Sequence, residues 1–301
     1  MLQRLHVTGT QLLDEANKPA QLRGISTHGI QWYPEYMNET AIRELHDEWK
    51  ANALRLALYT WEHEGYCMPG TDQAWEKKLV KDSAHYALDA GLYTIIDWHI
   101  LRDENPLKFM DEAVKFFEEM TAEFGDEPGI LYEICNEPNG PTTWEDIQAY
   151  ANTVIPVIRK KAPHAVILVG TPVWSQMIDE PGKSPLPYEN LMYVVHYYAE
   201  THQQELRDRT EQAILDGTPV FVTEFGICDA SGDGVVNLEQ AAKWLDLLNK
   251  YHVSFMEWNF SNCDEAAAML KADCTKTSGI TREDMRESGT WIYDVLHSYD
   301  E

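Results

Sequence analysis

The chain has 301 residues, with 24 Lys or Arg against 50 Asp or Glu, so its formal net charge at pH 7 is −26. A field of this sign repels phosphate backbones and anionic lipids, which argues against nucleic acid and membrane surfaces as partners but does not penalise a neutral polymer. No apolar run reaches the roughly 18 residues of a membrane-spanning helix. Because no linker, low-complexity tract or short repeat divides the sequence, residues 1–301 are predicted to form one domain.

The N-terminus lacks the apolar core of a signal peptide, since Met1 to Arg4 lead directly into alternating sequence. The protein is therefore expected to be cytoplasmic or to have lost a targeting segment. Its five cysteines are scattered and show no C-x-x-C spacing. They indicate neither a zinc site nor a disulfide framework, although a single bridge is left open.

The predicted strands begin after an opening segment, 5–20, which has a turn signal at Asn17-Lys18 and predicts a β-hairpin. Eight short runs rich in apolar and β-branched residues then recur, as is typical of parallel strands that are buried on both faces. These runs are 21–27, 53–60, 93–99, 130–137, 166–172, 192–199, 220–226 and 253–260.

Amphipathic segments follow most of the runs and predict helices at 39–50, 72–90, 106–124, 144–162, 203–216, 238–251 and 283–299. Only the connection 174–191 is rich in Pro and Gly and poor in helical signal. This alternation predicts a closed (β/α)8 TIM barrel with the hairpin covering its N-terminal end. An open doubly wound sheet is disfavoured, because Ser26 to Gly29 do not form a G-x-G-x-x-G turn.

Reactive residues of such barrels lie at the C-terminal ends of the strands. Nearly every predicted strand here ends in a polar, titratable or aromatic residue, and residues two apart on one strand share a face. These residues are His28, Arg55, Tyr59, His99, Asn136, Glu137, Trp174, His196, Tyr198, Glu224 and Trp258. Their number at one end of the barrel predicts a functional site there.

Glu137 and Glu224 end the fourth and seventh predicted strands and suit glycoside hydrolysis. In that reaction one carboxyl group protonates the leaving oxygen, while the other attacks the sugar or activates water. A single strand-end Glu is more often structural, but this pair has polar neighbours. Arg55 is expected to keep one carboxylate ionised, and Asn136 to bond a sugar hydroxyl.

Two other carboxylates are interpreted as structural. Asp97 lies two residues deeper than His99 and is expected to be a hydrogen-bonded interior group. Glu257 has the opposite strand parity to Trp258 and is expected to face the helices. A metal site built on the strand-end histidines and glutamates is also disfavoured, because the H-x-H pair of metal-dependent barrels is missing and Arg55 would oppose a cation.

Three of the ten tryptophans are candidates for stacking on a sugar ring. Trp32, Trp174 and Trp258 follow or end predicted strands, where one aromatic face can meet a pyranose. Tryptophans within the helical patterns are expected to pack the helices against the barrel.

These residues closely resemble glycoside hydrolase family 5, and in particular its bacterial endoglucanases. The resemblance covers nearly the whole chain, and its most specific segment is Asn136-Glu137-Pro138-Asn139-Gly140. The matching segments are 23–32 (RGISTHGIQW), 54–56 (LRL), 96–99 (IDWH), 132–140 (YEICNEPNG), 196–198 (HYY) and 222–226 (VTEFG). A looser match runs from Trp258 to Glu265.

The resemblance implies a retaining mechanism through a covalent glycosyl-enzyme, without metal or cofactor. It implies that Glu137 is the acid/base and Glu224 the nucleophile, and that Arg55 and Tyr198 hold the nucleophile. The sugar contacts it implies are His99, Asn136, His196 and Trp258 where the bond breaks, His28, Trp32, Tyr59 and Glu265 on the non-reducing side, and Trp174 on the leaving side.

Two positions depart from the family pattern. Phe225 follows the nucleophile where these endoglucanases commonly carry Trp, which is a mild packing change. Cys263 stands where many relatives carry a lysine before the acidic pair, which affects the outer sugar contacts and not the catalytic pair.

The sequence therefore predicts an endo-β-1,4-glucanase that acts as a monomer on cellulose, soluble cellulose derivatives or mixed-linkage β-glucan, with β-glucan or cello-oligosaccharide as its partner. The alternatives are a β-mannanase or xylanase on the same scaffold, or a non-catalytic carbohydrate-binding barrel. The last would be expected to have lost one of the two glutamates. Because such an enzyme must meet its polymer outside the cell, an extracellular location with the signal removed is expected.

Overall fold

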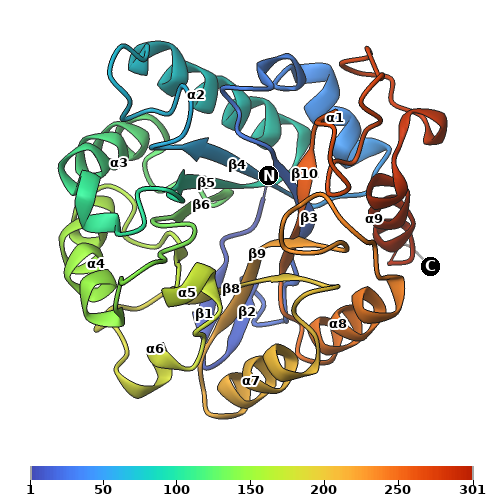
Figure 1. Cartoon of the computed structure of the whole chain (residues 1–301). Helices are drawn as coiled ribbons and strands as arrows, with labels where there is room; N and C mark the ends of the chain where they lie inside the picture. The colour runs from blue at the N-terminus through green and yellow to red at the C-terminus, as the bar shows by residue number, and fades with distance from the viewer. Residues whose placement is uncertain (1, 300–301) are drawn as a thin grey trace.

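The structure of the chain, a computed structural model, describes residues 2–299. Within them, eight parallel strands close into a barrel, each pairing with its neighbours in chain order until β10 meets β3 (Figure 1). The strands are β3 (Arg23–Thr27), β4 (Ala53–Tyr59), β5 (Tyr93–His99), β6 (Ile130–Glu133), β7 (Ile167–Val169), β8 (Leu191–Tyr198), β9 (Val220–Gly226) and β10 (Phe255–Phe260). The predicted (β/α)8 barrel is confirmed.

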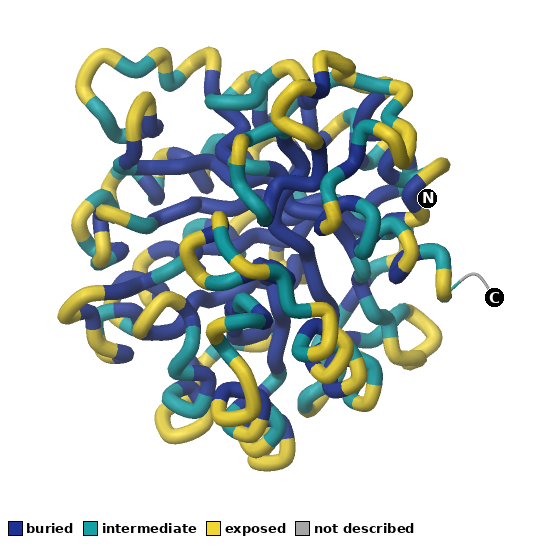
Figure 2. Tube along the Cα trace, turned by 45° about the vertical axis from the view of Figure 1, so that its right-hand side comes forward, coloured by how far each residue is buried: buried dark blue, intermediate teal, exposed yellow. Residues whose placement is uncertain are grey.

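Helices surround the barrel, and Figure 2 shows the strands as a buried centre inside them. They are α1 (Glu39–Asp47), α2 (Gln73–Ala90), α3 (Met110–Phe124), α4 (Trp144–Arg159), α5 (Pro172–Ser175), α6 (Glu180–Lys183), α7 (Gln204–Leu215), α8 (Leu238–Lys250) and α9 (Glu287–His297), with 3-10 turns η1 (Pro34–Tyr36), η2 (Pro106–Phe109) and η3 (Arg282–Asp284). Only the short α5 and α6 occupy the connection that the sequence marks as poor in helix. In the described part of the chain, no helix has both the length and the apolar character needed to cross a membrane.

The predicted hairpin with its turn at Asn17-Lys18 exists, and an unpredicted turn precedes it. Strands β1 (His6–Thr8) and β2 (Gln11–Leu13) pair antiparallel around Gly9, whose φ of +59° favours glycine. At the expected Asn17 turn, Leu13 pairs antiparallel with Pro19, and the chain returns toward β3. Leu5 and Leu12 are buried with apolar residues of the barrel strands, among them Leu22, Ala53, Ile95, Leu131, Leu168, Val194, Phe221 and Met256. The hairpin therefore closes the N-terminal end and leaves the other end for a site.

Two predicted strands end early, at Glu133 and at Val169. Beyond Glu133 the backbone leaves regular strand geometry but keeps bonds to both neighbours. Ile134 N donates to Leu168 O at 3.0 Å, and Asn136 N donates to Trp98 O at 3.3 Å. The segment that carries Glu137 is thus a well-held turn at the barrel mouth.

Strand β9 contains one extra residue relative to β8. Val194 lies opposite Phe221 and His196 lies opposite Glu224, so two steps along β8 match three steps along β9. Such an insertion is a β-bulge, which re-aims the side chains that follow it. Phe221 packs inside the barrel, and Glu224 nevertheless also faces the mouth.

The two carboxylates interpreted as structural behave as expected. Asp97 is fully buried inside the barrel and bonds His99 Nδ1 at 2.6 Å. Glu257 points outward, where Ser288 of α9 donates to it at 3.2 Å. Strand parity therefore predicts both side chains correctly.

Candidate active site

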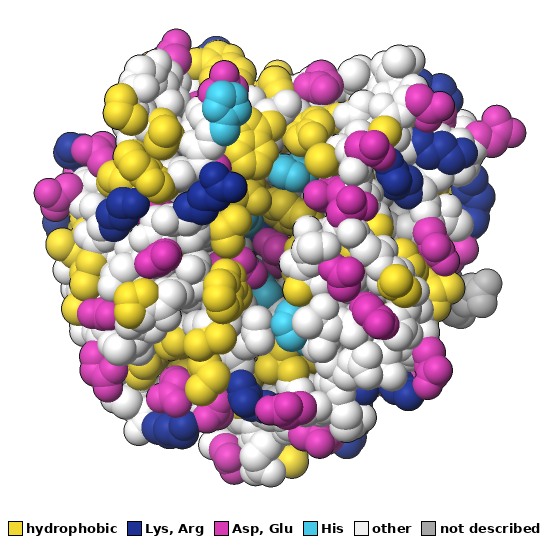
Figure 3. Space-filling model, in the orientation of Figure 1, with side chains coloured by type: hydrophobic (Ala, Val, Ile, Leu, Met, Phe, Trp, Pro, Cys, Tyr) yellow, Lys and Arg dark blue, Asp and Glu magenta, His cyan; other side chains and the backbone are white. Residues whose placement is uncertain are grey.

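A cleft of ≈ 360 Å³ opens at the C-terminal ends of the strands. Figure 3 shows acidic and histidine side chains gathered with hydrophobic ones in the hollow at the middle of this face. The cleft contains ten of the residues predicted from the sequence, namely His28, Tyr59, His99, Glu137, Trp174, His196, Tyr198, Glu224, Trp258 and Glu265. Arg55 and Asn136 are fully buried and do not line it, and Trp32 packs on Tyr59 with ring centroids 4.4 Å apart.

Arg55 is the cation at the centre of the site. Its guanidinium bonds Glu133 twice, through Nε at 2.8 Å and through Nη2 at 3.1 Å. Nη1 donates to Glu224 Oε2 at 3.2 Å, and Nη2 lies 3.0 Å from Asp97 Oδ2. One guanidinium therefore compensates several carboxyl groups, and burial raises the pKa of Asp97 to about 7 in spite of Arg55.

Glu224 is held at both oxygens. Arg55 reaches Oε2, and the Tyr198 hydroxyl donates to Oε1 at 2.9 Å. These donors fix the plane of the carboxylate. The side chain keeps a small opening to the cleft, since Glu224 is 5% exposed.

A chain of hydrogen bonds determines which nitrogen of His196 carries a proton. Thr223 donates its hydroxyl proton to Glu133 Oε1 at 2.7 Å, because a carboxylate paired with Arg55 can only accept. The Thr223 oxygen therefore accepts from His196 Nε2 at 2.8 Å. Burial lowers the pKa of His196 to about 4, so the ring is neutral and Nδ1 presents a lone pair.

Glu137 lies at the end of this chain, with Oε1 2.9 Å from His196 Nδ1. Burial raises the pKa of Glu137 to about 8, and the carboxylates of Glu133 and Asp97 add to this against the opposing effect of Arg55. Near pH 7 the carboxyl group is protonated and donates to His196. The largest cause of the raised pKa of Glu137 is therefore its burial.

Asn136 lies behind the cleft wall and uses its whole amide. Its oxygen accepts from Arg55 Nη2 at 2.6 Å, and its nitrogen donates to Ile100 O at 3.1 Å and to His99 Nε2 at 3.2 Å. His99 in turn directs its Nδ1 proton to Asp97. The expected contact between Asn136 and a sugar hydroxyl stays a prediction.

Aromatic side chains flank the carboxyl pair on two sides. Trp258 stacks on His99 with ring centroids 5.3 Å apart. Trp174 is 45% exposed at the opposite edge, where its backbone N–H donates to Pro138 O at 3.0 Å. Both rings line the cleft, as predicted from their positions after strands.

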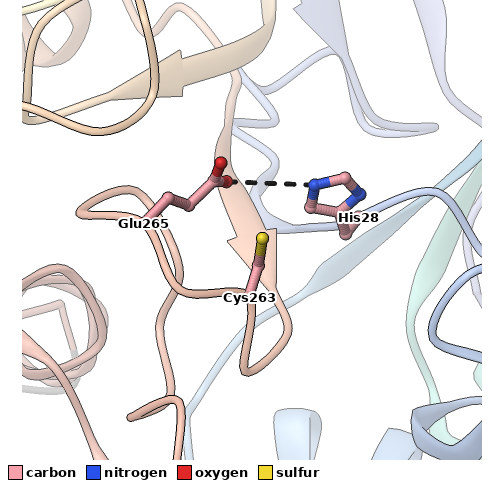
Figure 4. A group of neighbouring side chains, drawn as sticks. All are labelled: His28, Cys263 and Glu265. Atoms are coloured by element: carbon pink, nitrogen blue, oxygen red, sulfur yellow. Dashed lines mark ion pairs between the residues drawn. The ribbon is translucent and has the colours of Figure 1, made fainter.

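The other edge of the cleft brings together His28, Cys263 and Glu265, whose side chains point toward one another (Figure 4). His28 Nε2 lies 3.9 Å from Glu265 Oε1, and Asn259 donates to that oxygen at 2.8 Å. Cys263 also contacts the Tyr33 hydroxyl. Burial raises the pKa of Tyr33, and the hydrogen bond with Cys263 raises it further. This edge is therefore polar and well packed.

Two groups of side chains in the described residues bring possible metal ligands together. In each of them, Glu137–His196–Glu224 and His28–Cys263–Glu265, one ligand atom per residue lies within 4.8 Å of the others. A cation in the first group would be repelled by the guanidinium of Arg55, whose Nη1 lies 3.2 Å from Glu224 Oε2. In the second, His28 Nδ1 accepts the Gly29 N–H at 2.6 Å, so Nε2 carries the ring proton and has no lone pair for a metal. Neither donor set fits a metal well.

Sequence reasoning missed several residues of the site. Glu133 and Thr223 are buried members of the hydrogen-bond chain, and His202 and the segment 230–232 line the cleft. Strand parity identifies Glu133, two residues beyond the interior Leu131. Strand parity also identifies Thr223, two residues beyond the interior Phe221, and it is Glu224 that the bulge in β9 brings inward as well.

Comparisons with known proteins agree with this geometry. A model of the cellulase family, glycosyl hydrolase family 5, matches residues 13–264. The chain is 45% identical over 295 residues to endoglucanase A of Butyrivibrio fibrisolvens, covering 97% of this chain and 68% of that protein. It is 43% identical over 290 residues to an endoglucanase of Clostridium saccharobutylicum, covering 96% of this chain and 64% of that protein.

A solved structure gives the same result. The catalytic domain of an endoglucanase from Thermobifida fusca, crystallised in complex with cellotetraose, is 34% identical and aligns with a TM-score of 0.93 over 98% of this chain and 97% of that one. The chain thus spans 68% and 64% of the two curated relatives but nearly all of a catalytic domain. Fold, carboxyl pair and sequence agree, and the chain belongs to the cellulase family, glycosyl hydrolase family 5.

Proposed function

We propose that the chain is a retaining endo-β-1,4-glucanase, with Glu137 as acid/base and Glu224 as nucleophile. The observation that carries the proposal is the pair itself. One oxygen of each carboxyl group lies within 4.8 Å of the other, and the pKa of Glu137 is raised to about 8, so this group can act as the acid. Retaining glycosidases hold their carboxyl groups about 5–5.5 Å apart, and inverting ones about 6.5–9.5 Å apart to admit a water.

In the first step, Glu137 gives its proton to the leaving oxygen while Glu224 attacks the anomeric carbon. Arg55 and Tyr198 hold both oxygens of Glu224, so the attacking oxygen is oriented before the substrate arrives. In the resting state, His196 Nδ1 accepts a hydrogen bond from the protonated Glu137 and keeps the carboxyl group aimed.

In the second step, a water hydrolyses the glycosyl-enzyme. Esterification removes the negative charge of Glu224, and the proton of Glu137 has left with the first product. Glu137 is then a carboxylate that can take a proton from the attacking water. The two steps together retain the β configuration.

The sugar contacts follow the arrangement of the cleft. We assign His28, Trp32, Tyr59 and Glu265 to the non-reducing side, His99, His196 and Trp258 to the sugar whose bond breaks, and Trp174 to the leaving side. Asn136 lies behind the cleft wall and orients His99 and Arg55. The relatives named endoglucanases and the cellotetraose in one of them support β-1,4-glucan over mannan or xylan. An enzyme that cuts such a polymer works outside the cell, so we propose an extracellular location.

The test is a comparison of substrates. Cellulose, carboxymethylcellulose, mixed-linkage β-glucan, xylan and mannan are incubated with the protein, and viscosity and reducing ends are followed together. We expect a rapid loss of viscosity per bond cleaved on the glucans only, and NMR should show the β anomer first. Preferential cleavage of mannan or xylan, or an α anomer, would contradict the proposal.

The rate on unactivated glucans should fall on the alkaline side of about pH 8. The acid works only when protonated, and the pKa of Glu137 is about 8. Each unit above that pH should therefore lower kcat/KM about tenfold. The measurement is kcat/KM on cellopentaose between pH 5 and about 10. An alkaline limb near pH 5 would mean that Glu137 ionises as an ordinary carboxyl group.

Thr223→Val should move this alkaline limb to lower pH by about one unit, the equivalent of one hydrogen bond. Without the Thr223 oxygen, the His196 proton can shift from Nε2 to Nδ1, where it would stabilise the Glu137 carboxylate. Thr223→Ser keeps the hydroxyl and should keep the limb in place. A lower kcat with an unmoved limb would show that Thr223 only packs.

A further inference from the structure

A second groove, of ≈ 500 Å³, lies beside the cleft between the loop after β4 and the first turn of α2. Its lining includes Gln31, His63, Glu64, Asp72, Trp75 and Glu76. The groove adjoins the edge of the cleft that Tyr59 lines, because Trp32 packs on Tyr59 and also contacts the groove. The indole N–H of Trp32 donates to His63 O at 2.6 Å, so the two sites share a wall.

Two buried polar side chains of this groove each have one oxygen atom without a hydrogen-bond partner. Glu76 is 1% exposed and its Oε2 has no hydrogen bond. Gln31 is 6% exposed, and its Oε1 is also unpaired although its Nε2 donates to Tyr59 O at 3.0 Å. Buried polar atoms are rarely left without a partner, because each one costs folding free energy. Such atoms in the lining of a groove suggest that a ligand pairs with them.

The carboxyl group of Glu76 suits a neutral hydroxyl partner. Burial, with the nearby Asp72 and Glu64, raises the pKa of Glu76 to about 8. Near pH 7 the group is uncharged, so it can both donate and accept a hydrogen bond. A sugar hydroxyl has the same double capacity.

Trp75 provides an apolar face in the same groove, with 43% of its surface exposed. Asp72 caps the helix by accepting from Trp75 N at 3.0 Å, which fixes the first turn. The loop before it is also held, since Thr71 Oγ1 donates to Gly65 O and Gln73 Nε2 donates to Tyr66 O, both at 2.9 Å. The groove is therefore formed before any ligand arrives.

The chemistry of the groove favours a sugar over a cation. Among residues 2–299, three His, Cys, Asp or Glu ligand atoms come within 4.8 Å of one another only in the two groups of the cleft. Glu64, Asp72 and Glu76 consequently do not converge on one point as cation ligands do. An exposed indole beside buried, unpaired hydrogen-bonding groups instead matches a pyranose, with its apolar face and hydroxyl edge.

We propose that this groove binds a further segment of the β-glucan chain, on the non-reducing side of the cleft and across His63 from Trp32. The inference rests on the proposed function for its choice of sugar. The groove would contribute to the binding of long chains only, because a chain has to fill the cleft before it reaches the groove. Short oligosaccharides are handled by the cleft alone.

The first arm of the test compares chain lengths. Trp75→Ala should lower the ratio of kcat/KM for mixed-linkage β-glucan to that for cellotriose by roughly threefold to tenfold, the size of one aromatic contact. Leu215→Ala, which truncates a 64% exposed apolar residue on α7, is the matched control and should leave the ratio unchanged. An equal loss on both substrates, or an unchanged ratio in Trp75→Ala, would overturn the proposal.

The second arm measures binding and stability without hydrolysis. In a Glu224→Gln background, Glu76→Leu should weaken retention in a native gel containing β-glucan and also raise the melting temperature, since it removes an unpaired buried carboxyl group. Unaltered retention would overturn the proposal, as would a Glu76-dependent stabilisation by Ca²⁺. A wild type that cuts no glucan would instead reject the proposed function, so the two failures are distinguishable.

Discussion

Glu224→Gln is expected to reduce kcat on all glucans by on the order of 10⁴-fold or more, because the amide cannot form the glycosyl ester. The substitution keeps the size of the side chain and leaves Arg55 and Tyr198 in place. Oligosaccharide binding should therefore survive. The measurements are single-turnover hydrolysis and calorimetric binding of cellotetraose.

A matched control comes from the same cleft. Glu265→Gln makes the same change at a carboxylate that we assign to sugar binding, and its effect should appear mainly in KM. If Glu265→Gln lost as much kcat as Glu224→Gln, the assignment of the nucleophile would fail. A Glu224→Gln variant that retained turnover would have the same meaning.

Glu137→Ala should lower kcat/KM to a degree that depends on the leaving group of the substrate. On cellopentaose, which needs a proton for its departing hydroxyl, kcat/KM should fall by about 10²–10⁴-fold. On a dinitrophenyl cellobioside the first step needs no acid, so kcat/KM should change little. The second step has lost its base, and the glycosyl-enzyme should accumulate and appear as a burst of dinitrophenol.

Azide provides the decisive check on Glu137. A small anionic nucleophile needs no general base, so it should restore turnover of the Glu137→Ala variant and give a β-glycosyl azide. The wild type should be insensitive to azide. Equal losses on the two substrates, without a burst and without rescue, would show that Glu137 does not act as acid and base.

Much of the fold could be predicted because its signals are local. Runs such as 93–99 and 220–226 are apolar and have the length of a strand, and amphipathic segments separate most of the runs. The hairpin turn at Asn17 could be predicted because Asn17 carries a strong turn signal, whereas the turn at Gly9 could not, because Gly9 is a single glycine in alternating sequence. Two predicted strands extend beyond their observed ends at Glu133 and Val169, because the apolar composition continues past the last regular pairing.

The site could be predicted less completely, because its connections join distant parts of the chain. Glu137 and Glu224 stand at strand ends and belong to recognisable segments. The link between them runs through Glu133 and Thr223, and each bond of this link spans many residues; the bond from Thr223 to Glu133 spans 90. The proton on Glu137 is likewise set by burial, which only the folded barrel determines.

The extra residue in β9 has a consequence for anyone who transplants this chemistry. Consecutive residues of a regular strand point to opposite sides, yet here Thr223 bonds His196 inside the barrel while Glu224 faces the cleft. A designer who copied the catalytic side chains onto an idealised barrel with eight uniform strands would keep one of the two and lose the other. Deleting Val222 from this chain should do the same harm, by restoring regular alternation. The irregularity is thus part of the catalyst, and a graft has to carry it.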